Sequence, residues 1–274
     1  QRGFYYTGSD SYQSDFASQT VTHAQLVASA QGGSPLTWTI VHPNTKIRAG
    51  VDRDSDGTFD YVDGDVELDL AVLLDGPMNG TKMNTGLKSS GLLPNSDPYG
   101  TGEIMDPALL GRTGNSAPVD WVVVELRDPN NLTIIVDAIA ALVLSDGRVV
   151  MSSGKSPLLF ASATRGSYHV AVKHRNHLGV MTLLSGAYGI TVQRVDLSNP
   201  IVQTWGTDAR VEKIGISRLW SGDVNGDGVV RYTGLNNDRD IILTKIGGVV
   251  PTASAAGYVP EDVNLNGTVL YTGT

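Results

Sequence analysis

Cysteine is absent from the 274 residues of the sequence. A disulfide framework, a thiolate metal site and a cysteine nucleophile are therefore excluded. Long apolar runs are missing as well, because no stretch of eighteen apolar residues occurs, and no membrane span is expected. The first residues, QRGFYYTGSDSY, lack the basic start and apolar stretch of a signal peptide. If the protein is secreted, we expect this chain to be its mature form or a fragment.

Positive charge is also scarce. Lysine and arginine number 20 against 28 acidic residues, which gives a net charge of −8. Nucleic-acid binding needs a clustered basic face and is not expected. The acids concentrate in two segments, 52–69 and 223–240. This uneven distribution indicates local cation binding instead of a generally solvated acidic surface.

Catalytic motifs are lacking too. The sequence has no Gly-x-Ser-x-Gly elbow and no phosphate-binding glycine loop ending in Gly-Lys-Ser or Gly-Lys-Thr. His174 and His177 form the one close histidine pair, but on a continuous strand they would point to opposite faces, which disfavours zinc. Glu125 and Arg127 share a strand face and are expected to form a surface ion pair. We therefore do not expect an enzyme.

Short apolar segments rich in Val, Ile, Leu, Tyr and Thr predict strands joined by turns. Asp146-Gly147 between two apolar runs is the strongest hairpin signal. Strands are expected at 66–74, 119–127, 138–144, 148–151, 157–161, 167–174 and 189–195. Seven short strands in about 130 residues fit an all-β fold, an Ig-like β-sandwich with Greek-key connections.

The segments outside these strands are less regular. Residues 20–30 have the pattern of a helix or a strand, and residues 36–41 alternate apolar and polar as a half-buried strand does. Residues 78–118 show no strong periodicity. A loop of that length either presents a binding surface or packs over one edge of a sheet.

The sharpest motif is DRDSDGTFDYVD at residues 52–63. A calcium loop takes oxygen ligands at positions 1, 3, 5, 7, 9 and 12 and glycine at position 6. Those ligand positions are filled in order by Asp52, Asp54, Asp56, Thr58 (through its carbonyl), Asp60 and Asp63, with Gly57 at the turn. Five carboxylates within twelve residues would repel one another without a cation. The segment is predicted to bind Ca²⁺.

A second loop begins as DVNGDGVV at residue 223. Its expected ligands are Asp223, Asn225, Asp227 and the carbonyl of Val229. Position 12 falls on Gly234, so the closing acid is expected from Asp238 or Asp240, through a longer loop. The apolar residues that follow have helical spacing, as expected of a short helix leaving a calcium loop.

A partial third copy offers Asp262, Asn264 and Asn266. Asp223 and Asp262 lie 39 residues apart, and the Tyr-Thr-Gly that follows each opening is repeated at the same distance. This copy stops before any counterpart of Asp238. The natural protein is therefore expected to continue beyond Thr274, and this loop to be incomplete.

Residues 223–243 and 262–273 resemble the paired calcium-binding repeats of dockerin-type modules. The extension after the shared core departs from the usual dockerin loop, so the resemblance implies calcium binding without cohesin binding. Residues 52–60 are similar to the Asp-x-Asp-x-Asp-Gly loops of thrombospondin type 3 repeats. The strand around Trp121, GSYHVAV at 166–172 and HRNHLG at 174–179 resemble a C-terminal β-sandwich module of large bacterial proteins exported by type IX secretion.

Three parts are expected: an N-terminal segment ending in a calcium loop (1–64), a β-sandwich (65–200) and dockerin-like repeats (201–274). The predicted function is a secreted, non-enzymatic, calcium-binding structural or adhesive module at the cell surface. Its partners would be other domains or copies of the same protein. One alternative is a self-assembling subunit of an extracellular filament or surface layer. Another is a carbohydrate-binding module contacting glycans, whose expected feature is a cluster of exposed aromatic side chains.

Overall fold

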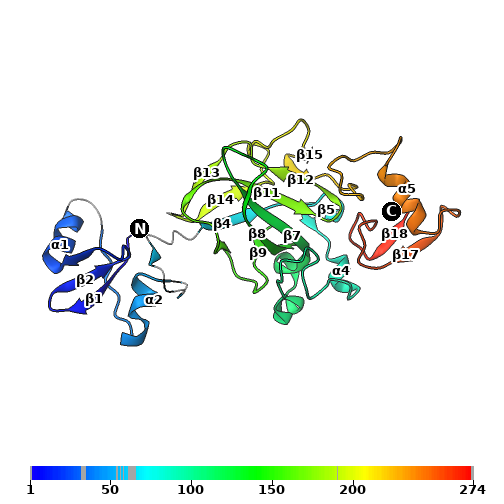
Figure 1. Cartoon of the computed structure of the whole chain (residues 1–274). Helices are drawn as coiled ribbons and strands as arrows, with labels where there is room; N and C mark the ends of the chain where they lie inside the picture. The colour runs from blue at the N-terminus through cyan, green and yellow to red at the C-terminus, as the bar shows by residue number, and fades with distance from the viewer. Residues whose placement is uncertain are drawn as a thin grey trace. The chain divides into compact units, whose positions relative to one another are not determined.

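The structure is a computed structural model, and it describes residues 2–31, 35–53, 55, 57, 59–60, 66–189 and 191–272. Strands account for 34% of the structure and helices for 15%, which confirms a mainly-β fold. The chain divides into a small unit, chiefly Gln1–Val66, and a large unit that holds most of residues 67–274. Each unit is described by itself (Figure 1).

The small unit is built on a three-stranded antiparallel sheet in the order β1-β2-β3. Its strands are β1 (Phe4–Gly8), β2 (Ser11–Ser14) and β3 (Thr20–Thr22). Ser9 and Asp10 make the first turn, and both have positive φ, as a two-residue hairpin requires. Three short helices follow, which are α1 (His23–Gln31), η1 (Pro43–Thr45) and α2 (Lys46–Gly50).

This unit has a thin core: among its described residues, the large apolar side chains that are buried are Leu26, Val51, Val66 and Tyr188. The strand predicted at residues 36–41 is wrong, since residues 35–42 form no regular element. Ile40 in this segment is fully exposed. Alternation of apolar and polar residues produces a strand only where a neighbouring strand pairs with the backbone.

The large unit contains a six-stranded sheet in the order β12-β11-β7-β8-β9, with β13 also paired to β11. Its strands are β7 (Pro118–Arg127), β8 (Ile135–Leu144), β9 (Val149–Val150), β11 (Gly166–His174), β12 (His177–Met181) and β13 (Gly186–Tyr188). The hairpin predicted at Asp146-Gly147 is confirmed, because β8 and β9 pair antiparallel on either side of it. Gly147 has a φ of +90°, which favours glycine at this turn.

A second sheet of three strands has the order β10-β4-β14 and contains β4 (Val66–Ala71), β10 (Leu158–Phe160) and β14 (Gln193–Asp196). β14 runs parallel to β4. Val66, Leu68 and Leu70 are fully buried on β4, whereas the residues between them are partly exposed. Trp121 on β7 is also fully buried, and its indole N–H donates to the Pro94 carbonyl at 2.9 Å. It is therefore a core residue, as predicted.

The long segment between these strands folds over the core of the large unit. It forms β5 (Met78–Asn79), β6 (Lys82–Met83), α4 (Gly86–Ser89), η2 (Pro107–Gly111) and η3 (Gly114–Ser116). Met83, Leu87, Met105 and Leu109 are buried, and α4 contacts β7. The segment was expected either to present a binding surface or to pack over a sheet, and the burial of these four side chains supports packing.

The remainder of the large unit carries the two repeats. Its elements are the hairpin of β15 (Arg210–Lys213) and β16 (Ile216–Leu219), helix α5 (Asp238–Lys245), and the hairpin of β17 (Ser254–Ala256) and β18 (Thr268–Leu270). Helix α5 is the short helix expected after the second loop. Within the described residues, no helix has the length and apolarity needed to cross a membrane.

Candidate metal-binding loops

The three Asp-rich loops share one backbone arrangement. In each, the first aspartate accepts a hydrogen bond on its Oδ2 from the amide of the glycine five residues later. The donor and acceptor pairs are Gly57 with Asp52 (3.3 Å), Gly228 with Asp223 (3.2 Å) and Gly267 with Asp262 (2.8 Å). All three glycines have φ between +80° and +95°. The carboxylate and the left-handed glycine together turn the chain back on itself, as a calcium loop requires.

The second and third loops also repeat the turns that follow. The Asn225 side chain accepts the Asp227 amide at 2.8 Å, and the Asn264 side chain accepts the Asn266 amide at 3.3 Å. Asp227 and Asn266 then each accept the amide two residues further on. The internal repeat is therefore present in the backbone as well as in the sequence.

One oxygen of the leading aspartate is left without a partner in the first two loops. Asp52 and Asp223 are only 6% and 5% exposed, yet the Oδ1 of each has no hydrogen-bond partner. A buried carboxylate oxygen that has lost water without gaining a partner is costly. Burial raises the pKa of Asp223, and the nearby charges of Asp238 and Asp227 raise it further. A bound cation would relieve both costs.

Of the two acids expected to close the second loop, Asp238 lies at the start of α5. Its buried carboxylate reaches back across the loop and accepts the amides of Val224 and Arg231, both at 2.8 Å. Asp240 lies two residues further along α5, with 61% of its side chain exposed. The sequence left both acids open as the closing ligand, and the geometry places Asp238 against the loop.

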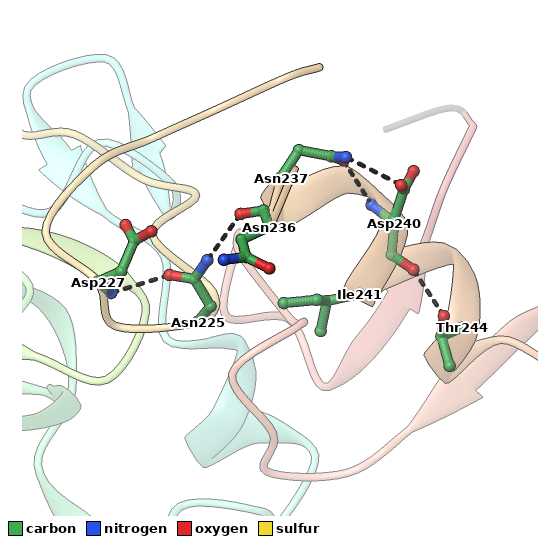
Figure 2. A pocket seen from close by; sticks show the side chains of 7 residues that line it. All are labelled: Asn225, Asp227, Asn236, Asn237, Asp240, Ile241 and Thr244. Atoms are coloured by element: carbon green, nitrogen blue, oxygen red, sulfur yellow. Dashed lines mark hydrogen bonds between the residues drawn. The ribbon is translucent and has the colours of Figure 1, made fainter. Parts of the chain in front are cut away.

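Asp240 instead borders a pocket of about 430 Å³ beside the second loop. Amide and carboxylate side chains dominate its lining, which consists of Asn225, Asp227, Asn236, Asn237, Asp240, Ile241 and Thr244. Figure 2 shows Asn237, the N-cap of α5, whose side-chain oxygen accepts the Asp240 amide at 3.0 Å. Two of the predicted calcium ligands, Asn225 and Asp227, thus face a solvent-accessible, oxygen-rich pocket. Val229 is exposed and donates its amide to Asp227.

The third loop differs in its charge and its surroundings. Asp262 is fully buried, and its two oxygens accept the amides of Asn266 and Gly267. The other two expected ligands, Asn264 and Asn266, are neutral. Burial raises the pKa of Asp262, while the positive charge of Arg175 opposes that rise. The protein itself therefore offsets much of the cost of burying the Asp262 carboxylate, as a bound cation would do in the other two loops.

The first loop is described in part. Asp60 lies beside its start, where its carboxylate accepts the Arg53 amide at 2.9 Å and pairs with the Arg53 side chain at 3.0 Å. The other predicted ligands, Asp54, Asp56, Thr58 and Asp63, lie outside the described residues. Among the residues that are described, no three His, Cys, Asp or Glu side chains converge as a metal cluster. Calcium loops also use amide and carbonyl oxygens.

A buried network of charged groups, which the sequence did not reveal, joins the third loop to the six-stranded sheet. Asp120 of β7 is fully buried and accepts hydrogen bonds from His174 (3.1 Å), Arg175 (3.0 Å) and Tyr258 (2.7 Å). Burial raises the pKa of Asp120, but the contacts with His174 and Arg175 lower it by more and hold it below its usual value. An aspartate inside an apolar strand was the available signal, because such a residue needs a partner.

The histidine pair belongs to this network, and its predicted placement was wrong. β11 ends at His174 and β12 begins at His177, so a two-residue turn brings the rings together, with 3.0 Å between their Nδ1 atoms. The Gly76 amide donates to His177 Nε2 at 3.2 Å, which places the His177 proton on Nδ1. Burial lowers the pKa of both histidines, so both are neutral near pH 7.

The same network holds the third loop directly. The Asn176 side-chain amide donates to the carbonyls of Pro260 and Asp262, both at 2.8 Å. The Arg175 guanidinium donates to the Val259 carbonyl and stacks 4.2 Å from the centroid of the Tyr258 ring. These contacts fix residues 258–262 to the β11–β12 turn. Asp120, His174 and His177 are buried, and the contacts of this network hold these parts of the structure together.

The ion pair predicted between Glu125 and Arg127 is confirmed, but its expected place on the surface is wrong. Glu125 is only 4% exposed and is also paired with Lys173 at 2.8 Å. Arg127 on the same strand and Lys173 on the neighbouring strand β11 therefore pair with one buried carboxylate. Residue spacing alone does not show the cross-strand pair.

Comparison with known proteins gives no relative from which a function can be transferred. No protein-family model, curated protein or solved structure matches the chain.

Proposed function

We propose that the protein is a non-enzymatic, calcium-binding structural module of a secreted cell-surface protein. One observation carries the proposal, namely the unpartnered and buried Oδ1 atoms of Asp52 and Asp223. Each belongs to a loop whose turn glycine, spacing and oxygen-bearing side chains fit Ca²⁺. Both orphaned atoms are the oxygens that a cation at the loop centre would contact.

The donor set favours calcium over transition metals. Carboxylate, amide and carbonyl oxygens are hard ligands, and the chain has no cysteine to offer a soft one. Asp223, Asn225, Asp227, the Val229 carbonyl and Asp238 would hold the ion in the second loop, with Asp240 at the border of the site. In the first loop the residues are Asp52, Asp54, Asp56, Thr58, Asp60 and Asp63.

The third loop is proposed as the weakest of the three sites. Asp262 contributes the one carboxylate, no atom of it is left without a partner as in Asp52 and Asp223, and Asn264 and Asn266 bring no charge. Affinity in calcium loops rises with the number of charged ligands. Two ions bound more tightly than a third are therefore expected.

The energetics of calcium binding support the proposed extracellular setting. A ligand that binds only the folded state stabilises that state by mass action. Calcium at the millimolar level outside cells fills even loose sites, whereas a chain without disulfides has few other strong cross-links available there. The bound ions would stiffen the loops and protect them from proteases.

We also propose that the two sheets of the large unit form a β-sandwich. The fully buried face of β4, with Val66, Leu68 and Leu70, needs an apolar surface opposite it. β7, which is buried on both faces over almost its whole length, offers such a surface. The partners of the module would be other domains or copies of the same surface protein.

Calcium titration by calorimetry, with limited proteolysis in calcium and in chelator, tests the proposal. Asp223→Asn is expected to remove one tightly bound ion and to expose the 223–238 segment to cleavage. Asp69→Asn is the matched control, because Asp69 is exposed and lies outside the loops. Unchanged stoichiometry and protease resistance in the Asp223 and Asp52 variants would overturn the proposal.

A further inference from the structure

Four aromatic side chains gather on the surface of the small unit. Tyr6 on β1 and Tyr12 on β2 face each other across the hairpin, with ring centroids 5.1 Å apart. Trp38, from the irregular segment, lies 5.5 Å from Tyr12 and 5.5 Å from His23 at the start of α1. Three segments separated in sequence thus contribute to one continuous aromatic cluster.

The cluster is open to solvent. Tyr6 is 54% exposed and Trp38 is 56% exposed, and His23 is exposed as well. Large aromatic rings seldom stay so exposed unless they contact a ligand or partner. The core of this unit is small, and these rings would stabilise the unit more if they were buried than they do when exposed.

Polar groups lie along the edges of the rings. The Tyr12 hydroxyl lies 3.4 Å from Nδ1 of His23, and the Tyr6 hydroxyl accepts the Asp10 amide at 3.5 Å. Each ring therefore offers an apolar face beside a hydroxyl or imidazole edge. The rings are inclined to one another by 34–63°, which makes an uneven surface and not a flat one.

A ligand that matches this surface has apolar C–H faces, hydroxyl groups at its edges and no charge. None of the four side chains is a lysine, an arginine or a carboxylate, and the whole chain has a net charge of −8. Nucleic acids and anionic polymers are disfavoured because their binding requires a basic surface. We propose that Tyr6, Tyr12, His23 and Trp38 form a binding platform for a neutral carbohydrate chain.

The proposal concerns a second binding site, separate from the metal-binding loops in its chemistry. The sugar rings would stack on Trp38 and Tyr6, the two most exposed members, while Tyr12 and His23 supply hydrogen bonds. Because Trp38 and Tyr6 are more than half exposed, replacing either one removes little buried surface. The platform can therefore be altered with little effect on the fold.

The test uses native gel electrophoresis of the full chain in millimolar calcium, in gels containing hydroxyethylcellulose, galactomannan or soluble starch, together with pull-down on chitin. At least one of these polymers is expected to retain the protein. Trp38→Ala and Tyr6→Ala should each weaken that binding by about tenfold or more. Trp38→Phe, which keeps an aromatic ring, should bind within a fewfold of the unaltered protein.

Trp205→Ala is the matched control, since Trp205 is 46% exposed and belongs to the large unit. Binding by this variant should be unchanged. The proposal fails if none of the four polymers retains the protein, or if the Trp205 variant loses binding equally. It also fails if sedimentation shows self-association that Trp38→Ala abolishes, because the platform would then contact a second copy. None of these outcomes is expected to change the calcium stoichiometry of the protein, which is measured separately.

Discussion

Replacing Asp223 with asparagine should change stability in opposite directions with and without calcium. Asparagine is nearly the same size, and its side-chain oxygen can take the place of Asp223 Oδ2, which accepts the Gly228 amide that shapes the turn. In chelator, the substitution removes a buried charge whose Oδ1 has no partner and which lies close to Asp227 and Asp238. The variant should therefore be as stable as the unaltered protein, or slightly more stable.

In calcium the order should reverse. With free calcium at a hundred times the dissociation constant, one site stabilises the folded state by about 2.7 kcal/mol. Weakened binding in the variant removes most of that gain. For a unit of roughly 200 residues the loss corresponds to a lowering of the melting temperature by about 5–10 °C.

Differential scanning calorimetry of both proteins, in millimolar calcium and in excess chelator, measures the four melting temperatures. In calcium, the melting temperature of the variant should be well below that of the unaltered protein. In chelator, it should be no lower. If the variant shows the same deficit under both conditions, Asp223 acts only as a turn-forming residue, and the cation argument is refuted. Asp69→Asn should show no difference in either condition.

Further outcomes follow from the third loop and its buried network. Asp262→Asn should leave the two tighter calcium-binding phases in the calorimetric titration unchanged, and loss of either phase would contradict the ranking of the loops. Arg175→Ala leaves the Asp120 carboxylate buried without its cationic partner, so denaturant unfolding should show a loss of roughly 3–5 kcal/mol. Tyr258→Phe removes one hydrogen bond and should cost about 1–2 kcal/mol by the same measurement. Because burial depresses the pKa of His177 below 6.5, the unfolded chain binds more protons, and stability should fall as pH drops below that value. Thermal unfolding at pH 7 and pH 5 should show a smaller drop for His177→Gln than for the unaltered protein.

The strands β4, β7, β8, β9, β10 and β11 could be predicted from sequence because each has a local cause, whereas the sheet β1-β2-β3 and the strand β12 were not predicted. The short apolar runs, and turn dipeptides such as Asp146-Gly147, determine strand and hairpin within a few residues of chain. Residues 36–41 show the limit of that reasoning. Their alternation matches a strand, but a strand also needs a partner, and pairing is decided by residues far away in sequence.

The turns of the Asp-rich loops were predictable for the same reason, since each is formed by an aspartate and a glycine five residues apart. That Asp238 and not Asp240 lies against the second loop was not predictable, because it depends on the direction in which α5 leaves the loop. Asp120 and Tyr258 lie 138 residues apart, and no local pattern links them. The turn at His174 and His177 was missed because alternation assumes an unbroken strand.

The hydrogen bonds from Asn176 to the third loop have a mechanical consequence. Its two hydrogen bonds, with those of Arg175, join residues 258–262 to the end of β11, which is hydrogen-bonded along β7. Tension applied to the repeat would pass through these bonds into the strand ladder of the large sheet instead of stretching a linker. The repeat would thus act as a fixed anchor point, and its detachment under load would have to break a buried charge network first.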